Sequence, residues 1–442
     1  MLKKLNSKIT TLISNKIIKN YIWVFLGQNI GTVFSMLSMI VTLRIISAFE
    51  YGSLVIVQTY CLLISNIFCI RTFNGFIKFA TEAEGKGDYD LVKKYINSSL
   101  ILDLVAGIIA FIFGFLLLKP VTFLMEWDIE TVKYVGLYLA VCIFYPILNG
   151  IPTGILRKLN YFKEANEIHA FVYGLQTLVL LITLIFQVRS LPIILIEYAC
   201  TEILESVILL IVAFIILQKN DLYKNFWKCG LAHDVKFVKY NISYGLLSTF
   251  DQILSNLSTL LINKYIGNLA TTYLKIITRI CSIFSKITNP ISQVIYPELC
   301  EWITQKKYKK ALEFSLKYCV IIFGIGMIAF GALFGTYDYW TRIFDAGMGQ
   351  AKNQSMLYLL YSFLAISMIC VHQLSLAMGM MKLNLFLAAF FDSLYLICLI
   401  PCVKKWGVIG YLVLQIAQLL VVAMVKVFFV FKKVNKIEKN NA

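Results

Sequence analysis

The sequence predicts an all-α, polytopic membrane protein with about twelve transmembrane helices in two pseudo-symmetric six-helix bundles around a central cleft. Of its 442 residues, 59% are hydrophobic and only 15% are charged. Apolar segments of roughly 20 residues, the length of a spanning helix, recur from Tyr21 to Phe431. These runs are continuous, unlike the alternating strands of a membrane β-barrel. Because a chain in lipid must satisfy its backbone hydrogen bonds internally, the segments are expected to be helices.

The longest polar loop divides the apolar segments six plus six. The predicted spans are 21–46, 54–79, 96–118, 132–155, 168–187, 193–217, 240–262, 270–296, 314–335, 356–378, 385–403 and 408–431. We therefore expect an N-terminal bundle over 21–217, a cytoplasmic linker over 218–239 and a C-terminal bundle over 240–431. Pro146 and Pro152 are expected to break the fourth span.

Basic residues in the loops predict the orientation. With the N-terminus in the cytoplasm, 26 of the 41 Lys and Arg residues fall in cytoplasmic segments and eight in external ones. Cytoplasmic loops carry such an excess, so both termini are expected to be cytoplasmic. The same bias explains most of the net charge of +17, and nucleic acid is not an expected partner. Residues 1–20 predict a basic amphipathic surface helix, and residues 432–442 a basic tail.

The eleven cysteines are scattered singly, without a Cys-x-x-Cys pair. Most lie in predicted spans, where cysteine behaves as a small apolar residue. We expect neither disulfides nor a metal site. The chain lacks a P-loop, so ATP hydrolysis is not expected, and no cofactor is predicted.

The eighth span carries three basic residues, Lys275, Arg279 and Lys286. A charge at the bilayer centre costs roughly 2.5–3.5 kcal/mol on insertion scales, so these side chains should avoid lipid. Their spacing of i, i+4 and i+11 places them within about 40° of one another around a helix. Gln293 lies on the same stripe, which gives the span a cationic, polar face about 27 Å long.

The second span repeats this pattern with Arg71, Asn74 and Lys78. If the two halves are related by symmetry, spans two and eight occupy equivalent places and both faces could line one cleft. For Lys78 and Lys275 a second interpretation stays open, in which the long side chains reach the membrane surfaces. A cleft lined by Arg and Lys favours an anion, and Arg suits phosphate through paired N–H donors.

Carboxylates also lie inside predicted spans, and they are candidates for coupling transport to an ion. They are Asp103, Glu197, Glu202, Glu205, Asp251 and Asp392. Asp251 is the preferred candidate, because it sits beside the cationic span in a helical hairpin. The alternative, favoured for each residue taken singly, is that the carboxylates pair with Lys or Arg, as buried charges require.

Short motifs along nearly the whole chain resemble the Wzx-type O-antigen flippases, the polysaccharide transporter branch of the MATE-like MOP flippase superfamily. The motifs are Leu43-Arg44-Ile45-Ile46 with Glu50-Tyr51-Gly52, Asn74-Gly75-Phe76, Gly87-Asp88-Tyr89, the segment 154–162, Asn289-Pro290, Tyr296-Pro297-Glu298-Leu299 and Gly407-Val408-Ile409-Gly410.

This resemblance implies a transporter rather than an enzyme. It implies movement of an undecaprenyl-pyrophosphate-linked oligosaccharide, such as an O-antigen or related polysaccharide repeat unit, across the bacterial inner membrane by alternating access. It further implies a cationic lumen for the pyrophosphate, and it leaves open coupling to H⁺ or Na⁺ and contacts with other membrane proteins of polysaccharide assembly.

Two other functions compete with this hypothesis. A MATE-type cation or drug antiporter would share the fold but should have a carboxylate-dominated cavity. An O-antigen polymerase or lipid-dependent glycosyltransferase would need a substantial external loop for its active site, and the external loops here are short.

Overall fold

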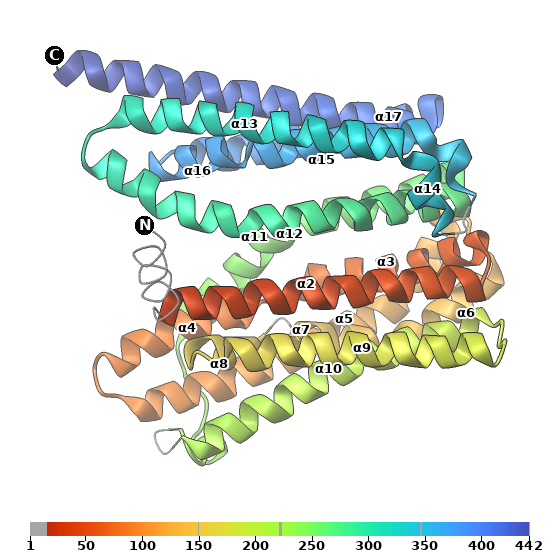
Figure 1. Cartoon of the computed structure of the whole chain (residues 1–442). Coiled ribbons are helices and arrows are strands. Elements are labelled where there is room, and N and C mark those ends of the chain that lie inside the picture. Colours follow the sequence, from red (N-terminus) through yellow and green to blue (C-terminus); the bar gives the residue numbers. More distant parts are fainter. Residues whose placement is uncertain (1–15, 149, 221–222, 345–346, 442) are drawn as a thin grey trace, which may run out of the picture. The chain divides into compact units, whose positions relative to one another are not determined.

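The computed structural model describes residues 16–148, 150–220, 223–344 and 347–441 (Figure 1). Over 16–28, 246–251, 287–294, 296–297, 304, 381 and 438–441 it describes the backbone alone. Every regular element in these ranges is a helix. The chain forms two compact units, Met1–Leu260 and Leu261–Ala442, and each has its own cluster of buried hydrophobic residues.

The first unit contains ten of the described helices and most of an eleventh. They are α2 (Lys16–Ile45), α3 (Ala48–Phe68), α4 (Thr72–Glu84), α5 (Tyr89–Met125), α6 (Ile129–Tyr138), α7 (Val141–Leu148), α8 (Ile151–Lys158), α9 (Phe162–Ile185), α10 (Leu191–Lys219), the short 3₁₀ helix η1 (Phe226–Lys228) and α11 (Val235–Ile266). The boundary between the units falls inside α11. Helices α2 and α9 lie side by side along their length (Figure 1).

The second unit holds the end of α11 and the elements that follow it. They are α12 (Asn268–Thr304), α13 (Tyr308–Gly335), α14 (Tyr337–Arg342), the 3₁₀ helix η2 (Met348–Ala351), α15 (Lys352–Ser367), α16 (Ile369–Ala377) and α17 (Met381–Asn441). Within this unit, α12 packs against α15 and α16, and α13 packs against α15.

Each predicted span coincides with a helix or a run of helices. By length and composition, seven described helical segments could cross a membrane, and the bent pair Ile129–Tyr138 with Val141–Lys158 would make an eighth. One of the seven, Lys382–Ile437, contains two predicted spans. The remaining predicted spans correspond to α2, α11 and α12. The protein is therefore a multi-pass, all-helical membrane protein.

The last two predicted spans form the two arms of α17, which bends at Gly407 with φ 61° and ψ −144°. Glycine adopts this positive φ without the steric cost that a Cβ would add. The second arm continues to Asn441, so residues 432–441, predicted as a tail, prolong the helix. The predicted surface helix over 1–20 lies outside the described residues except for 16–20, which belong to α2.

Spans two and four are interrupted rather than continuous. α3 and α4 are separated at residues 69–71, and the fourth span comprises α6, α7 and α8. The sequence predicted that prolines break the fourth span. Pro152 indeed lies in the first turn of α8, where its missing N–H costs nothing. Pro146 lies inside α7.

The basic loops of unit 1 meet at one end of that unit (Figure 1). Lys158, at the end of α8, forms an ion pair of 2.7 Å with Glu84 at the end of α4. Asn97 of α5 donates to the carbonyl oxygens of Phe226 and Cys229, at 2.9 and 2.5 Å. Residues 223–234 of the predicted linker are thus attached to the bundle, and the buried Phe226 lies in its hydrophobic core.

The basic segments of unit 2 also gather at one end. Lys433 donates from Nζ to the carbonyl oxygen of Met378 at 2.6 Å. Near this end, Leu299, Leu312 and Val430 belong to one buried hydrophobic cluster. In each unit, therefore, the described loops richest in Lys and Arg lie at one end.

Candidate functional site

The cationic residues of the second span begin where that span is interrupted. Arg71 precedes α4 in a left-handed conformation with φ 51°, which is uncommon for a residue with a side chain. Asn74 and Lys78 follow at i+3 and i+7, on the helix face opposite to the buried Phe76 and Ala80. The structure thus places Asn74 and Lys78 on one face of α4, and Arg71 directly before its first residue.

The first part of α11 packs against this face of α4. Arg71 donates from Nη2 to Oε1 of Gln252 at 2.9 Å, and Lys78 Nζ lies 4.5 Å from the ring centroid of Tyr240. The approach depends on Gly75, because a Cβ there would lie 2.0 Å from Oδ1 of Asn241. Amide and aromatic partners hold the two cations without neutralising them.

Arg157 of α8, just beyond the predicted span 132–155, also contacts α4. Its guanidinium carbon lies 4.9 Å from the ring centroid of Phe73 on α4. Helix α8 approaches α4 closely at Gly154, where a Cβ would lie 3.0–3.2 Å from atoms of Phe73 and Phe76. The signal in the sequence was the Gly154–Arg157 spacing, which places both residues on one side of a helix.

The second cationic group lies on α12, in unit 2. Lys275, Arg279, Ser282 and Lys286 are all half-buried. The intervening Ile276, Ile277 and Cys281 are buried. The helix is thus amphipathic, with the three basic side chains on one face, as the spacing predicted. The side chain of Gln293 lies outside the described residues.

The α12 stripe could hold an anion at more than one level of the helix. Lys275 and Lys286 are 11 residues apart, or about 16 Å along the axis. No acidic residue occurs between Asn268 and Pro297. Arg279 at the middle offers a planar fork of N–H donors that matches two phosphate oxygens. The two cationic groups belong to different units, and a cleft shared between them remains a prediction.

Asp103 of α5 lies where both interrupted spans of unit 1 meet. It is 1% exposed, and its oxygens accept hydrogen bonds from Thr72 Oγ1 and from the backbone N–H of Ile151, all at 2.8 Å. Thr72 is the first residue of α4 and Ile151 the first of α8. The carboxylate therefore joins the N-termini of the two helices that follow the breaks, where a negative charge is favoured by the helix dipoles.

Three carboxylates lie on α10, and each has a polar partner in unit 1. Glu205, buried, contacts His169 Nδ1 of α9 at 2.7 Å. Glu202 accepts a hydrogen bond of 2.7 Å from the Tyr138 hydroxyl. Glu197 accepts one of 2.5 Å from Thr183. Glu205 and His169 thus bring a buried carboxylate and an imidazole together between α10 and α9.

The remaining candidates lie elsewhere. Asp392 of α17 accepts a hydrogen bond from Gln418 Nε2 at 2.7 Å, across the two arms of that helix. The side chain of Asp251, the preferred coupling residue, lies outside the described residues. Asp103 and Glu205 were expected to pair with Lys or Arg, and in the described part of the chain this is wrong. Their partners are neutral N–H and O–H groups and a histidine, which satisfy the oxygens without a second long side chain.

The overall fold matches solved transporter structures. An inward-facing multidrug resistance MATE family transporter of the MOP superfamily matches with a TM-score of 0.77 at 14% identity, over 93% of this chain and 96% of its own. A MOP superfamily transporter from Pyrococcus furiosus matches with a TM-score of 0.65 at 15% identity, over 96% of each chain. A mutant of the Vibrio cholerae MATE transporter VcmN matches with a TM-score of 0.63 at 11% identity, over 97% of this chain and 98% of its own. The fold is therefore that of the MATE-like MOP superfamily transporters.

The sequence itself defines the family more narrowly. The family described as "Polysaccharide biosynthesis protein" matches residues 17–302, and the chain belongs to it. The chain is also similar to the inner membrane protein YghQ of Escherichia coli (strain K12), with 26% identity over 147 residues. That alignment covers 33% of this chain and 41% of YghQ. The chain is therefore a member of the polysaccharide biosynthesis protein family with a MATE-like fold.

Proposed function

We propose that the protein is a flippase that moves a lipid-linked oligosaccharide with an anionic pyrophosphate head group across the bacterial inner membrane. The carrier class is undecaprenyl pyrophosphate, and the sugar is an O-antigen or related polysaccharide repeat unit. In this proposal both termini are cytoplasmic. The lipid tail stays in the bilayer while the pyrophosphate and sugars move through a polar path by alternating access.

The observation that carries the proposal is the cationic face of α12. Lys275, Arg279 and Lys286 share one half-buried face with no acidic residue among them. Such a face would cost several kcal/mol against lipid, so it is best explained by a polar path. A pyrophosphate brings at least two negative charges and several acceptor oxygens, which suit one Arg fork flanked by two ammonium groups.

The basic residues of unit 1 support the same substrate class. Arg71, Lys78 and Arg157 are held next to amide or aromatic groups, so their charges stay available to an anion. A comparable case is the Pyrococcus furiosus transporter, for which a reverse polarity of the binding pocket suggests a different function. In this chain the positive stripe of α12 favours an anionic cargo.

We propose further that an ion gradient drives the cycle through a carboxylate. In unit 1, the contact between Glu205 and His169 joins two titratable groups on different helices. Protonation of this pair would change the attraction between α9 and α10, which is what coupling requires. Whether the ion is H⁺ or Na⁺ is decided by which gradient accelerates transport.

The test is transbilayer movement of a lipid-pyrophosphate-linked oligosaccharide in proteoliposomes, measured with an enzyme that modifies outward-facing sugar. The variants are Arg279→Ala and Lys286→Ala. Lys224→Ala serves as the matched control because it removes one exposed lysine from the loop before η1. We expect both stripe variants to insert normally and to lose movement, while the control behaves as wild type.

Wild-type movement in both stripe variants would contradict the cationic path. Failure of the wild-type protein to move the lipid under pH and sodium gradients would contradict the flippase itself. In that event a cation antiporter becomes the better hypothesis, because α10 carries three carboxylates in unit 1.

A further inference from the structure

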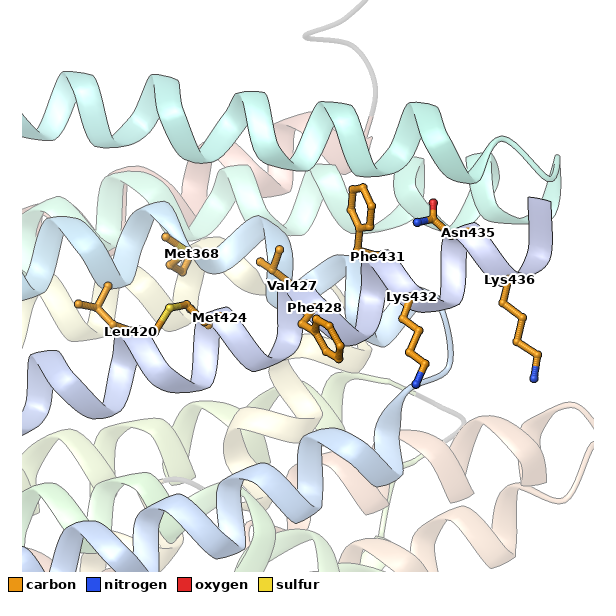
Figure 2. Close-up of a pocket in the computed structure, with 10 residues that line it drawn as sticks. Met368, Leu420, Met424, Val427, Phe428, Phe431, Lys432, Asn435 and Lys436 are labelled. Atoms are coloured by element: carbon orange, nitrogen blue, oxygen red, sulfur yellow. The ribbon is translucent and has the colours of Figure 1, made fainter. Parts of the chain in front are cut away.

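A groove runs along the second arm of α17 in unit 2, away from the α12 stripe. It has a volume of about 860 Å³, and Met368, at the junction of α15 and α16, contributes its other wall (Figure 2). On α17 its lining positions are mostly three or four residues apart, so they are neighbours on the helix surface. These positions are Leu420, Ala423, Met424, Val427, Phe428, Phe431, Lys432, Asn435 and Lys436.

The chemistry of the groove changes sharply at one level. From Leu420 to Phe431 every lining side chain is apolar, and from Lys432 onward every one is polar or basic. Figure 2 shows the side chains of Lys432 and Lys436 extending beyond Phe428, with Asn435 next to Phe431. Met424 and Phe428 are 63% and 62% exposed, so the protein itself leaves the apolar section uncovered.

The length of the apolar section corresponds to one membrane leaflet. The helix rises about 16 Å between Leu420 and Phe431. Half of a hydrocarbon core about 30 Å thick is about 15 Å. Lys432, Asn435 and Lys436 form the basic rim of the groove. This rim lies at the end of unit 2 that the loop charges assign to the cytoplasm, where Lys433 contacts Met378. The groove therefore extends from the cytoplasmic head-group level to near the middle of the bilayer.

The rim is positively charged, and its side chains offer N–H donors to a ligand. In the part of the chain with described side chains, neither Lys432 nor Lys436 forms an ion pair. The amide of Asn435, which lines the same groove, adds a neutral donor. A phosphate monoester or diester matches this arrangement, because ammonium groups and an amide N–H all donate to its oxygens. A zwitterionic head group would bring its own ammonium toward the lysines and bind less well.

We propose that this groove is a binding site for an anionic phospholipid of the cytoplasmic leaflet. An acyl chain lies along Met424 and Phe428, and the phosphate is held by Lys432, Asn435 and Lys436. Basic pockets beside transmembrane helices on the cytoplasmic side bind anionic head groups in this way. The site is independent of the flippase proposal, because it uses none of the residues of the α12 or α4 faces.

The test measures retention of phosphatidylglycerol and of phosphatidylcholine by the purified full-length protein, using native mass spectrometry during lipid titration. One variant, Lys432→Gln with Lys436→Gln, removes the rim charges. A second, Met424→Trp, fills the apolar section and keeps both lysines. The matched control is Lys224→Gln with Lys228→Gln, which removes two exposed lysines from the loop around η1.

We expect the wild type and the control to prefer phosphatidylglycerol. The Lys432→Gln, Lys436→Gln variant should bind phosphatidylglycerol about 30-fold more weakly. Each lysine near the membrane surface contributes about 1 kcal/mol, and about 1.4 kcal/mol corresponds to a tenfold change in affinity. Met424→Trp should weaken binding of phosphatidylglycerol while the charge is unchanged.

Equal affinity for the two phospholipids, or unchanged affinity in the Lys432→Gln, Lys436→Gln variant, would overturn the proposal. Stoichiometric displacement of phosphatidylglycerol by a polyprenyl pyrophosphate would also overturn it and would assign the groove to that carrier. Because flipping and lipid retention are measured separately, loss of one leaves the other proposal standing.

Discussion

Replacing Asp103 should separate two roles that this carboxylate could have, joining helices and carrying an ion. Its oxygens accept from Thr72 and from the N–H of Ile151. Asp103→Asn keeps the shape and one carbonyl acceptor, but it removes the negative charge. Asp103→Leu removes every acceptor. The two variants therefore differ chiefly in whether the N-termini of α4 and α8 remain joined.

The expected loss of stability follows from the groups left without partners. Without an acceptor, the Ile151 N–H becomes a buried, unpaired donor, which costs about 1–3 kcal/mol. The Thr72 hydroxyl also loses its acceptor, for which we take the ~0.6 kcal/mol average of polar contacts between membrane helices. We expect Asp103→Leu to lower the free energy of unfolding by about 2 kcal/mol and Asp103→Asn by less than about 1 kcal/mol.

The measurement is reversible unfolding in mixed micelles with increasing SDS, followed by helix content. Gly150→Ala provides an independent check, because its Cβ would lie 1.9 Å from Oδ2 of Asp103. Gly150→Ala should lower the free energy of unfolding of the wild-type protein. In an Asp103→Ala background, where the carboxylate is absent, it should lower it little further. If Asp103→Leu unfolds at the wild-type midpoint, or Asp103→Asn is equally damaged, the joining role is refuted. If Asp103→Asn is stable but transport no longer responds to a pH gradient, Asp103 also carries the coupling proton.

Three further predictions test other contacts of the fold. Gly407→Ala should cost about 1–3 kcal/mol, because the bend of α17 needs a positive φ, and a lower melting temperature in detergent would confirm it. Gly75→Ala should also lower the melting temperature by separating α4 from α11, and Asn241→Ala in the same chain should restore part of it; no rescue would contradict the contact. Asn97→Ala should release the segment that contains Phe226, seen as faster proteolysis between α10 and α11 with the rest of the chain intact. Unchanged cleavage there would show that hydrophobic burial of Phe226 suffices.

The sequence alone determined the helical elements and the polar face of α12. Hydropathy over about 20 residues is a local property that reports whether a segment can cross a membrane. Helical periodicity is equally local, so the spacing of Lys275, Arg279 and Lys286 was enough to place them on one face. The loop charges were likewise sufficient to predict which segments share an end, because the positive-inside rule acts on composition rather than on packing.

Only the tertiary structure decided the partners of the buried polar groups. Asp103 meets Ile151 across 48 residues of chain, and Glu205 meets His169 across 36. No periodicity links such positions, so the sequence could offer only a general expectation of pairing with Lys or Arg. The interruption at Arg71 and the contact of Arg157 with Phe73 were hidden for the same reason. Burial requires that a polar group be satisfied, but which group satisfies it depends on the helices that packing brings together.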